Sequence, residues 1–199
     1  MFIQVIQGKV QDAAAVRRQL ERWVEELGPG ATGWLGSTAG VAADGTFVAT
    51  ARFESEEAAR ANSGRTEQGA WWEAMSALFD GEPTFRDCAT VDMINGGGSD
   101  DAGFVQVIEG RADRQRLLDE APDAEEFIAR VRPDVLGETT AWPGDGSFVQ
   151  IVYFSSEAAA REGERFQLAP EDAERFDQLV ALLPADRFID LSDPWLYTA

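Results

Sequence analysis

The chemistry open to this chain is limited first by the residue types that it lacks. None of its 199 residues is histidine. That absence excludes histidine-based haem ligation, Ser-His and Cys-His nucleophile pairs, and nearly all zinc sites. The single cysteine, Cys88, cannot form an intrachain disulfide, and within a strand it is typical of a small buried hydrophobe rather than a nucleophile. Any catalysis must therefore use carboxylates, Arg, Tyr, Trp, amides, Cys88 or the backbone.

Carboxylates are abundant, but their spacing does not indicate a metal site. The chain has 36 acidic and 17 basic residues, which gives a net charge of −19. The acidic runs at 54–57 and 119–126 are typical of helix starts and solvated faces. The charge favours solubility and disfavours nucleic acid and anionic membrane surfaces as partners.

The first residues indicate a cytoplasmic protein. The stretch MFIQVIQGKVQD lacks the basic start and the apolar run of a secretory leader. No segment approaches the roughly 18 apolar residues that a membrane span needs. We therefore expect a soluble protein of the cytoplasm.

The chain is a tandem repeat. FIQVIQG at 2–8 recurs as FVQVIEG at 104–110, and Gly36–Arg60 aligns with Gly137–Arg161 without a gap, with 12 of 25 positions identical. A Gly-rich, acidic stretch between the copies is typical of a flexible linker. The sequence therefore predicts a first repeat at 1–95, a linker at 96–103 and a second repeat at 104–199.

Both repeats have the same predicted order of elements. A strand is followed by a helix, a hairpin with an Asp-Gly turn, a helical region in two pieces and a last strand. We expect Asp12, Ser55 and Ser156 to cap helices, and Pro122 to kink or split the first helix of the second repeat. The expected strands are 2–7, 34–38, 47–53 and 84–92, then 104–109, 136–142, 148–154 and 187–191.

This order predicts an α+β fold. The pattern βαββαβ is the ferredoxin-like order, in which two helices cover one face of a four-stranded sheet and leave the other face bare. Both alternating faces of FVQIVYF, at 148–154, are largely apolar, as a sheet covered on both sides requires. We therefore expect two ferredoxin-like repeats packed sheet to sheet as an intrachain α/β barrel.

The first strand of each repeat carries a glutamine in its middle. Gln4 and Gln106 are expected to lie in the interior, where an amide needs hydrogen-bond partners. Either they pin the two halves together across the barrel, which we favour, or they face a pocket.

Three segments resemble a known family. They are FVATARFESEEAARANSGRTEQGAWWEAMSALF at 47–79, the closing strand TFRDCATVDMI at 84–94, and FVQIVYFSSEAAAR at 148–161. All three are similar to the antibiotic biosynthesis monooxygenase family of the dimeric α/β barrel superfamily. Most members of that family are homodimers, so the resemblance implies a fused dimer. The expected unit is an intrachain pseudo-dimer, which can assemble further as a homodimer.

The resemblance also implies where a site would lie. In the family, the pocket lies between the helices and the sheet of each half, and the broken second helix forms its lid. Asn62, on the first piece of that helix, and Trp71 or Trp72, on the second, match the family's pocket positions. The haem-degrading members use an Asn, a Trp and an axial His, so the lack of histidine argues against haem degradation here.

A cofactor-free oxygenase of this family type has modest requirements. It needs an apolar cavity, hydrogen bonds to the substrate's oxygens and a means of taking a proton. Neither a metal nor an organic cofactor is expected, and no residue stands out as the base. Arginine would favour an enolate or phenolate by its charge. The catalytic candidates are Asn62, Trp72 and Arg86, and the candidates for substrate binding are Gln4, Trp34, Arg52, Trp71 and Tyr153.

Each candidate also has a purely structural interpretation. Trp71 and Trp72 at helical spacing are more typical of a core, and Asn62 before Ser63 and Gly64 is as typical of a residue that caps or turns a helix break. Arg86 is equally typical of a surface ion pair.

Two functions therefore stay open. The first is a cofactor-independent monooxygenase-like enzyme acting on an aromatic or polyketide-like small molecule. The second is a protein of the same fold that binds a small hydrophobic or aromatic ligand, or a partner, without catalysis. Either is compatible with a site in only one repeat, which the divergence of WWEAM from ERFDQL in the second helices favours.

Overall fold

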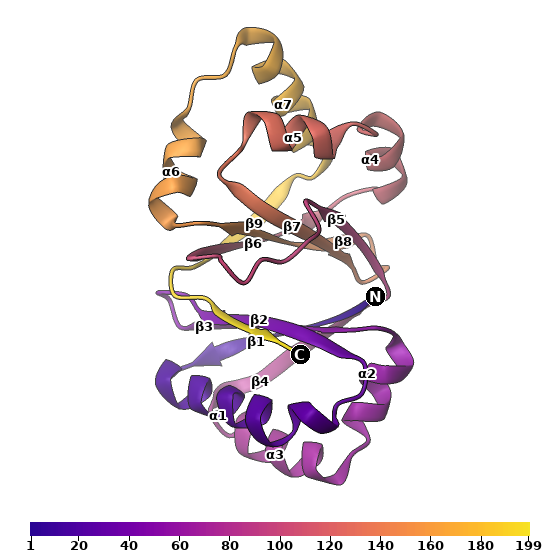
Figure 1. Cartoon of the computed structure of the whole chain (residues 1–199), viewed down its shortest axis with the longest axis vertical. Helices are drawn as coiled ribbons and strands as arrows, with labels where there is room; N and C mark the ends of the chain where they lie inside the picture. The colour runs from indigo at the N-terminus through magenta and orange to yellow at the C-terminus, as the bar shows by residue number, and fades with distance from the viewer. The chain divides into compact units, whose positions relative to one another are not determined.

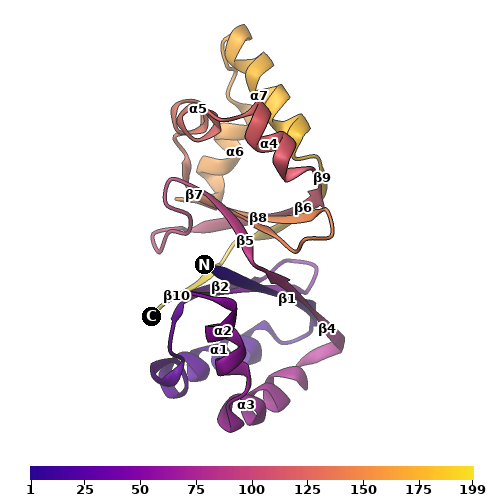
Figure 2. The ribbon, with the colours of Figure 1, turned by 90° about the vertical axis from the view of Figure 1, so that its right-hand side faces the viewer.

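The computed structural model describes residues 1–199 as two compact units (Figure 1). Unit 1 comprises Met1–Val91 and Asp193–Ala199, and unit 2 comprises Asp92–Ser192. Each unit contains one five-stranded sheet, and its helices lie on one side of that sheet, as the turned view shows (Figure 2). No helix combines the length and the apolar character that crossing a membrane requires.

Unit 1 holds the first repeat and the last strand of the chain. Its sheet has the order β10-β2-β3-β1-β4. Its elements are β1 (Phe2–Val10), α1 (Ala13–Glu26), the 3-10 turn η1 (Gly28–Gly30), β2 (Trp34–Val41), β3 (Thr46–Phe53), α2 (Glu56–Ser63), α3 (Thr66–Ser76), β4 (Phe79–Cys88) and β10 (Trp195–Thr198).

Unit 2 holds the second repeat, and its sheet has the order β5-β7-β8-β6-β9. Its elements are β5 (Thr90–Ile94), β6 (Phe104–Arg111), α4 (Arg114–Glu120), α5 (Ala124–Val131), β7 (Val135–Trp142), β8 (Ser147–Phe154), α6 (Glu157–Arg165), α7 (Pro170–Leu182) and β9 (Ala185–Leu191).

The ferredoxin-like order of both repeats is confirmed, but each sheet has a fifth strand that the sequence analysis missed. The single strand expected at 84–92 is wrong, because β4 ends at Cys88 and Thr90–Ile94 forms β5 in the sheet of unit 2. The C-terminal Trp195–Thr198 likewise forms β10 beside β2 in the sheet of unit 1. The strand that follows β4 of the first repeat, β5, thus belongs to the sheet of the second repeat, and the strand that follows β9 of the second repeat, β10, belongs to the sheet of the first.

Local signals set the helix boundaries as expected. The side chains of Asp12, Ser55 and Ser156 each accept a hydrogen bond from a backbone N–H three residues later, as N-caps do. The region around Pro122 separates α4 from α5, because proline lacks the N–H that a continuous helix would need. The split predicted for this helix is confirmed.

The two units differ in how their helices meet their sheets. In unit 1, buried residues of helices and strands share the same clusters: Val16 and Met75 pack with Ala39 and Ala49, for example. In unit 2 the cluster formed by α4, α5 and α7, which includes Leu179, is separate from the cluster on the sheet, which α6 joins through Ala160. The helices α4, α5 and α7 therefore pack on one another and leave space above part of the sheet.

Candidate functional site

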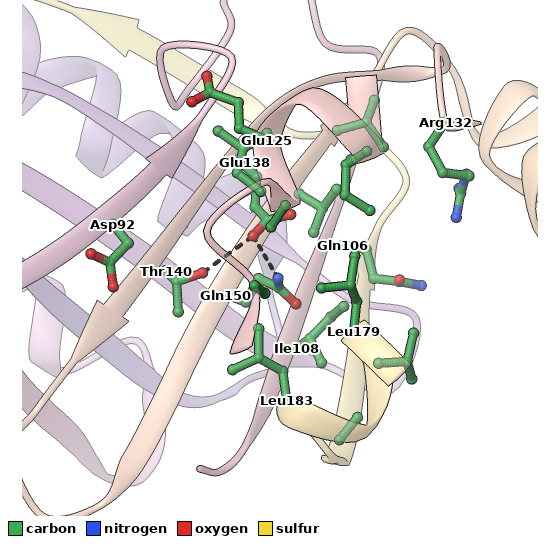
Figure 3. Close-up of a pocket in the computed structure, with 18 of the residues that line it drawn as sticks. Asp92, Gln106, Ile108, Glu125, Arg132, Glu138, Thr140, Gln150, Leu179 and Leu183 are labelled. Atoms are coloured by element: carbon green, nitrogen blue, oxygen red, sulfur yellow. Dashed lines mark hydrogen bonds between the residues drawn. The ribbon is translucent and has the colours of Figure 1, made fainter. Parts of the chain in front are cut away.

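A cavity of about 800 Å³ fills that space in unit 2 (Figure 3). This volume falls within the range usual for small-molecule sites. The floor is the helix-facing side of the sheet, with lining residues from all five strands, β5 to β9. The roof is apolar and comes from α4, α5, α7 and the residue that follows α7, with Leu117, Leu118, Ile128, Phe176, Leu179 and Leu183.

The corresponding space in unit 1 is occupied by tryptophan side chains. The Trp23 and Trp34 rings meet edge to face with centroids 4.9 Å apart, and the Trp71 ring lies 6.4 Å from that of Trp23. The roof of the unit 2 cavity contains no tryptophan. Because a tryptophan is much larger than a leucine, this difference in composition accounts for a filled core in one repeat and a cavity in the other.

Three polar side chains stand together on the floor of the cavity. Glu138 and Thr140 lie on β7, and Gln150 lies opposite them on β8 (Figure 3). Gln150 Nε2 donates a hydrogen bond of 2.6 Å to Glu138 Oε1, and Thr140 Oγ1 donates one of 3.3 Å to the same oxygen. The other oxygen, Oε2, receives no hydrogen bond from the protein.

Glu138 is unusual because it is a carboxylate in an almost buried position. Only 9% of the residue is exposed, and no cationic side chain is paired with it. Burial raises the pKa of Glu138 above its usual value, although the hydrogen bonds from Gln150 and Thr140 act in the opposite direction. The Glu138 carboxyl is therefore easier to protonate than a carboxyl on the surface.

A second polar group lies on the other side of the floor. Asp190, on β9, accepts a hydrogen bond of 2.9 Å from Gln106 Nε2 at its Oδ1, and its Oδ2 pairs with Arg161 Nη2 of α6. The Arg161 guanidinium also lies over the Phe104 ring and bonds Glu164 at 2.9 Å. Its charge is thus balanced within unit 2.

The interior glutamines have partners within their own sheets. Gln106 is buried, as expected, but its amide donates to Asp190 of the same sheet, and the residue lines the cavity. The interpretation that we favoured, in which Gln106 links the two halves, is therefore wrong. Gln4 is only half-buried, and its Nε2 donates to Asp87 Oδ1 at 2.9 Å in the same arrangement. The alternative in which the glutamine faces a pocket describes Gln106.

The candidates from the first repeat do not share one space. Trp34, Trp71 and Trp72 pack on the helix side of the unit 1 sheet, among its core clusters. Asn62 is 7% exposed, and its Oδ1 accepts a hydrogen bond of 3.0 Å from Arg65 Nη1 at the break between α2 and α3. These contacts are those of a well-packed helix layer.

Arg52 and Arg86 lie on the opposite face of the same sheet. Arg52 Nη1 donates to Thr38 Oγ1 at 3.2 Å, whereas its neighbours in β3 pack towards the helices. Arg86 Nη2 donates to Gln7 Oε1 at 2.6 Å, whereas the adjacent Phe85 meets Trp72. The sheet therefore separates both arginines from the tryptophans.

Tyr153 lies in unit 2 but outside its cavity. Its neighbours Val152 and Phe154 line the cavity, so alternation along β8 directs Tyr153 to the other face of the sheet, where it is 1% exposed. The functional roles predicted for Asn62, Trp72, Arg86 and the other candidates stay predictions. The structure does not bring the set together.

The sequence analysis missed the polar group at Glu138, although the sequence contained a signal for it. In the gap-free alignment of the repeats, Glu138, Thr140 and Gln150 stand opposite Ser37, Ala39 and Ala49. A glutamate and a glutamine at inward positions of apolar strands are costly unless they have partners or a use. Comparing the two floors position by position would have pointed to this group.

Three solved structures match nearly the whole chain. A candidate monooxygenase from Fusobacterium nucleatum is 9% identical, with a TM-score of 0.74 over 99% of this chain and 94% of its own. One from Lactobacillus acidophilus is 10% identical, with a TM-score of 0.71 over 99% and 95%. An anthrone oxidase-like protein is 13% identical, with a TM-score of 0.62 over 100% and 91%.

These matches establish the fold. No family model matches the sequence, and no curated protein matches it. At identities this low, a structural likeness shows architecture and not activity. The resemblance seen in the sequence is confirmed at that level: the chain has the fold of tandem monooxygenase-like proteins, with two ferredoxin-like repeats.

Proposed function

We propose that this protein is a cofactor-independent monooxygenase-like enzyme that acts on an aromatic or polyketide-like molecule in the cavity of unit 2. The observation that carries the proposal is the cavity itself, an apolar space of about 800 Å³ above a small group of hydrogen-bonding side chains. This combination encloses a flat hydrophobic molecule and orients its oxygens. The fold that the chain shares with candidate monooxygenases accords with the proposal.

The proposed chemistry needs no external reductant. A substrate such as anthrone has an acidic CH₂ group beside aromatic rings. Loss of a proton leaves a carbanion, which can transfer an electron to O₂. One oxygen atom then becomes the new carbonyl oxygen, and the other leaves as water with the two hydrogens of the CH₂ group. The substrate supplies all the electrons, and the protein supplies enclosure, orientation and proton transfer.

The side chains of unit 2 divide these tasks. The leucines and Phe176 of the roof contact the rings of the substrate and exclude water. The amides of Gln106 and Gln150 and the hydroxyl of Thr140 lie on the floor, where they can bond the substrate's oxygens as well as their present partners. Unit 1, whose core is filled by tryptophan, serves as scaffold.

Oxygen uptake with a panel of anthrones and hydroquinones tests the proposal. We expect uptake by the purified protein and its loss in Ile108→Phe, because this larger side chain projects into the cavity from β6. Ser37→Ala, at the unit 1 position that matches Glu138, is the control and should keep full uptake. Ligand binding without uptake would favour the alternative of a non-catalytic binding protein. Equal uptake by Ile108→Phe would place the activity outside the cavity.

A further inference from the structure

We infer that Glu138 accepts a proton from the ligand of this cavity, and that the ligand is an apolar molecule with an acidic O–H or C–H group. The inference deepens the proposed function and rests on it for the later steps with oxygen. It assigns the base that the sequence analysis lacked, and it narrows the substrate class to weak acids that enter uncharged.

The geometry leaves one oxygen of Glu138 for the ligand. Oε1 is held by Gln150 and Thr140, whereas Oε2 has no donor within the protein. The only side-chain oxygen or nitrogen that is fully buried without a partner is the hydroxyl of Tyr197. Since Oε2 also lacks a partner, it is not fully buried, and it is accessible from the cavity that Glu138 lines. A ligand O–H or C–H placed against Oε2 would supply the missing donor.

No cation around the cavity neutralises Glu138. Arg132 pairs with Asp134, and Arg161 pairs with Asp190 and Glu164. A ligand that entered as an anion would therefore find no unpaired arginine and would meet the charge of Glu138. This arrangement selects against carboxylates and phosphates as ligands.

The other acidic side chains that line the cavity already have partners. Asp92, on β5, binds Arg114 of α4 and accepts a hydrogen bond of 2.8 Å from Trp142 Nε1. Glu125, on α5, accepts one of 3.0 Å from the backbone N–H of Asn95. Glu138 differs from both because its hydrogen bonds come only from neutral side chains of its own sheet.

The proposed step moves one proton. The O–H or C–H bond of the ligand breaks, its proton binds Oε2, and the electron pair stays on the ligand as a phenolate or an enolate. Gln150 acts as a positioning residue, because its bond to Oε1 fixes the orientation of the carboxyl group. The raised pKa of Glu138 supports this role, since a stronger base takes the proton more readily near neutral pH.

Binding of 1-naphthol and of its methyl ether tests the inference without any oxygen chemistry. The two probes have almost the same shape, but only the naphthol can donate to Oε2. Near neutral pH, we expect the wild type to bind neutral naphthol roughly tenfold more tightly than the ether, because hydrogen bonds to charged groups are strong. Glu138→Gln should lose most of this preference, and Ser37→Ala should keep it.

The ultraviolet absorption of the bound naphthol gives a second readout. Its ionised form absorbs at longer wavelength, and a naphtholate beside the Glu138 carboxylate would place two negative charges together. We therefore expect the bound probe to ionise at higher pH in the wild type than in Glu138→Gln. Circular dichroism of each variant shows whether it is folded, and Glu138→Leu provides a second variant without a carboxylate.

The outcomes separate the inference from the proposed function. Naphthol preference without oxygen uptake by any compound of the panel would support the inference and overturn the proposed function. Oxygen uptake that is unchanged in Glu138→Gln and Glu138→Leu would overturn the inference and leave the function. Equal binding of the two probes, or no binding of either one, would also overturn the inference.

Discussion

Gln150 on β8 holds the buried carboxylate of Glu138 on β7 through a hydrogen bond of 2.6 Å. The matching residues in the first repeat are Ser37 and Ala49, which cannot form such a pair. One repeat thus has small side chains beneath a tryptophan-filled core, and the other has a polar pair beneath a cavity. Two repeats of the same ferredoxin-like order therefore differ in their interiors, and only the second contains this candidate site.

The stability of Glu138→Gln should depend on pH differently from that of the wild type. The pKa of Glu138 is raised above 4.5 in the folded protein, so protonation of this carboxyl stabilises the fold. This stabilisation is fully present below pH 4.5 and is lost as the pH rises through the pKa of the folded protein. Glutamine does not titrate. Raising the pH from 4 to 8 should therefore destabilise the wild type more than Glu138→Gln. The free energy of unfolding of the variant minus that of the wild type should be more positive near pH 8 than near pH 4.

Urea denaturation of both proteins at the two pH values measures this difference. All other titrating groups are shared, so their effects largely cancel in the comparison. A difference between the variants that stays constant with pH would show that Glu138 keeps an ordinary pKa in the folded protein.

Two matched isoleucines test the contrast between the repeats. Ile6 and Ile108 occupy the same position on the first strands, but Ile6 packs against a core cluster and Ile108 lines the cavity. Ile6→Phe should lower the free energy of unfolding by roughly 1–3 kcal/mol, as overpacking usually does. Ile108→Phe should cost less. Equal losses in denaturant melts would contradict the assignment of a packed core to one repeat and a cavity to the other.

Trp72 distinguishes the site expected from the sequence from the site in unit 2. Its ring contacts Phe85, with centroids 5.0 Å apart, and packs against the core of unit 1. Trp72→Ala should therefore lower stability by about 3 kcal/mol, the low end for such truncations because Trp72 is half-buried. Oxygen uptake per folded molecule should be retained. A folded variant without activity would return the site to the first repeat, and Asn62→Ala provides an independent check.

Tyr197 on β10 carries a buried hydroxyl without a hydrogen-bond partner. Burial raises its pKa to about 12, so the hydroxyl stays protonated at neutral pH. An unsatisfied buried hydroxyl destabilises a fold, and Tyr197→Phe should therefore raise the free energy of unfolding by about 1 kcal/mol. A loss of stability in thermal and urea melts would mean that the hydroxyl has a partner in solution.

The repeats, the ferredoxin-like order, the helix caps and the split at Pro122 could all be predicted, because each depends on local spacing or a single residue type. The extra strands could not. Thr90–Ile94 and Trp195–Thr198 follow complete repeats, and their partners lie far away in the sequence. Edge pairing of this kind is decided by tertiary structure, which periodicity along the chain does not record.

The site was harder to predict for a related reason. Trp71 and Trp72 attract attention as aromatic residues, but their bulk fills the space that a ligand would need. Glu138 is one acidic residue among 36, and only its place on the inner face of a strand sets it apart. The lack of tryptophan in the helices of the second repeat indicates the position of the cavity as clearly as the tryptophans of the first repeat indicate a filled core.

The most direct test of the account is the rate of oxygen uptake by Glu138→Gln, with the best substrate of the panel at saturation. General base catalysis typically contributes 10²–10⁴-fold, so kcat should fall by at least about 100-fold, whereas the KM should rise by no more than the roughly tenfold loss expected in binding. The wild-type rate should also rise with pH as Glu138 ionises, and this rise should be absent from any residual rate of the variant. An unchanged kcat with an unchanged pH profile would contradict the central claim that Glu138 is the base.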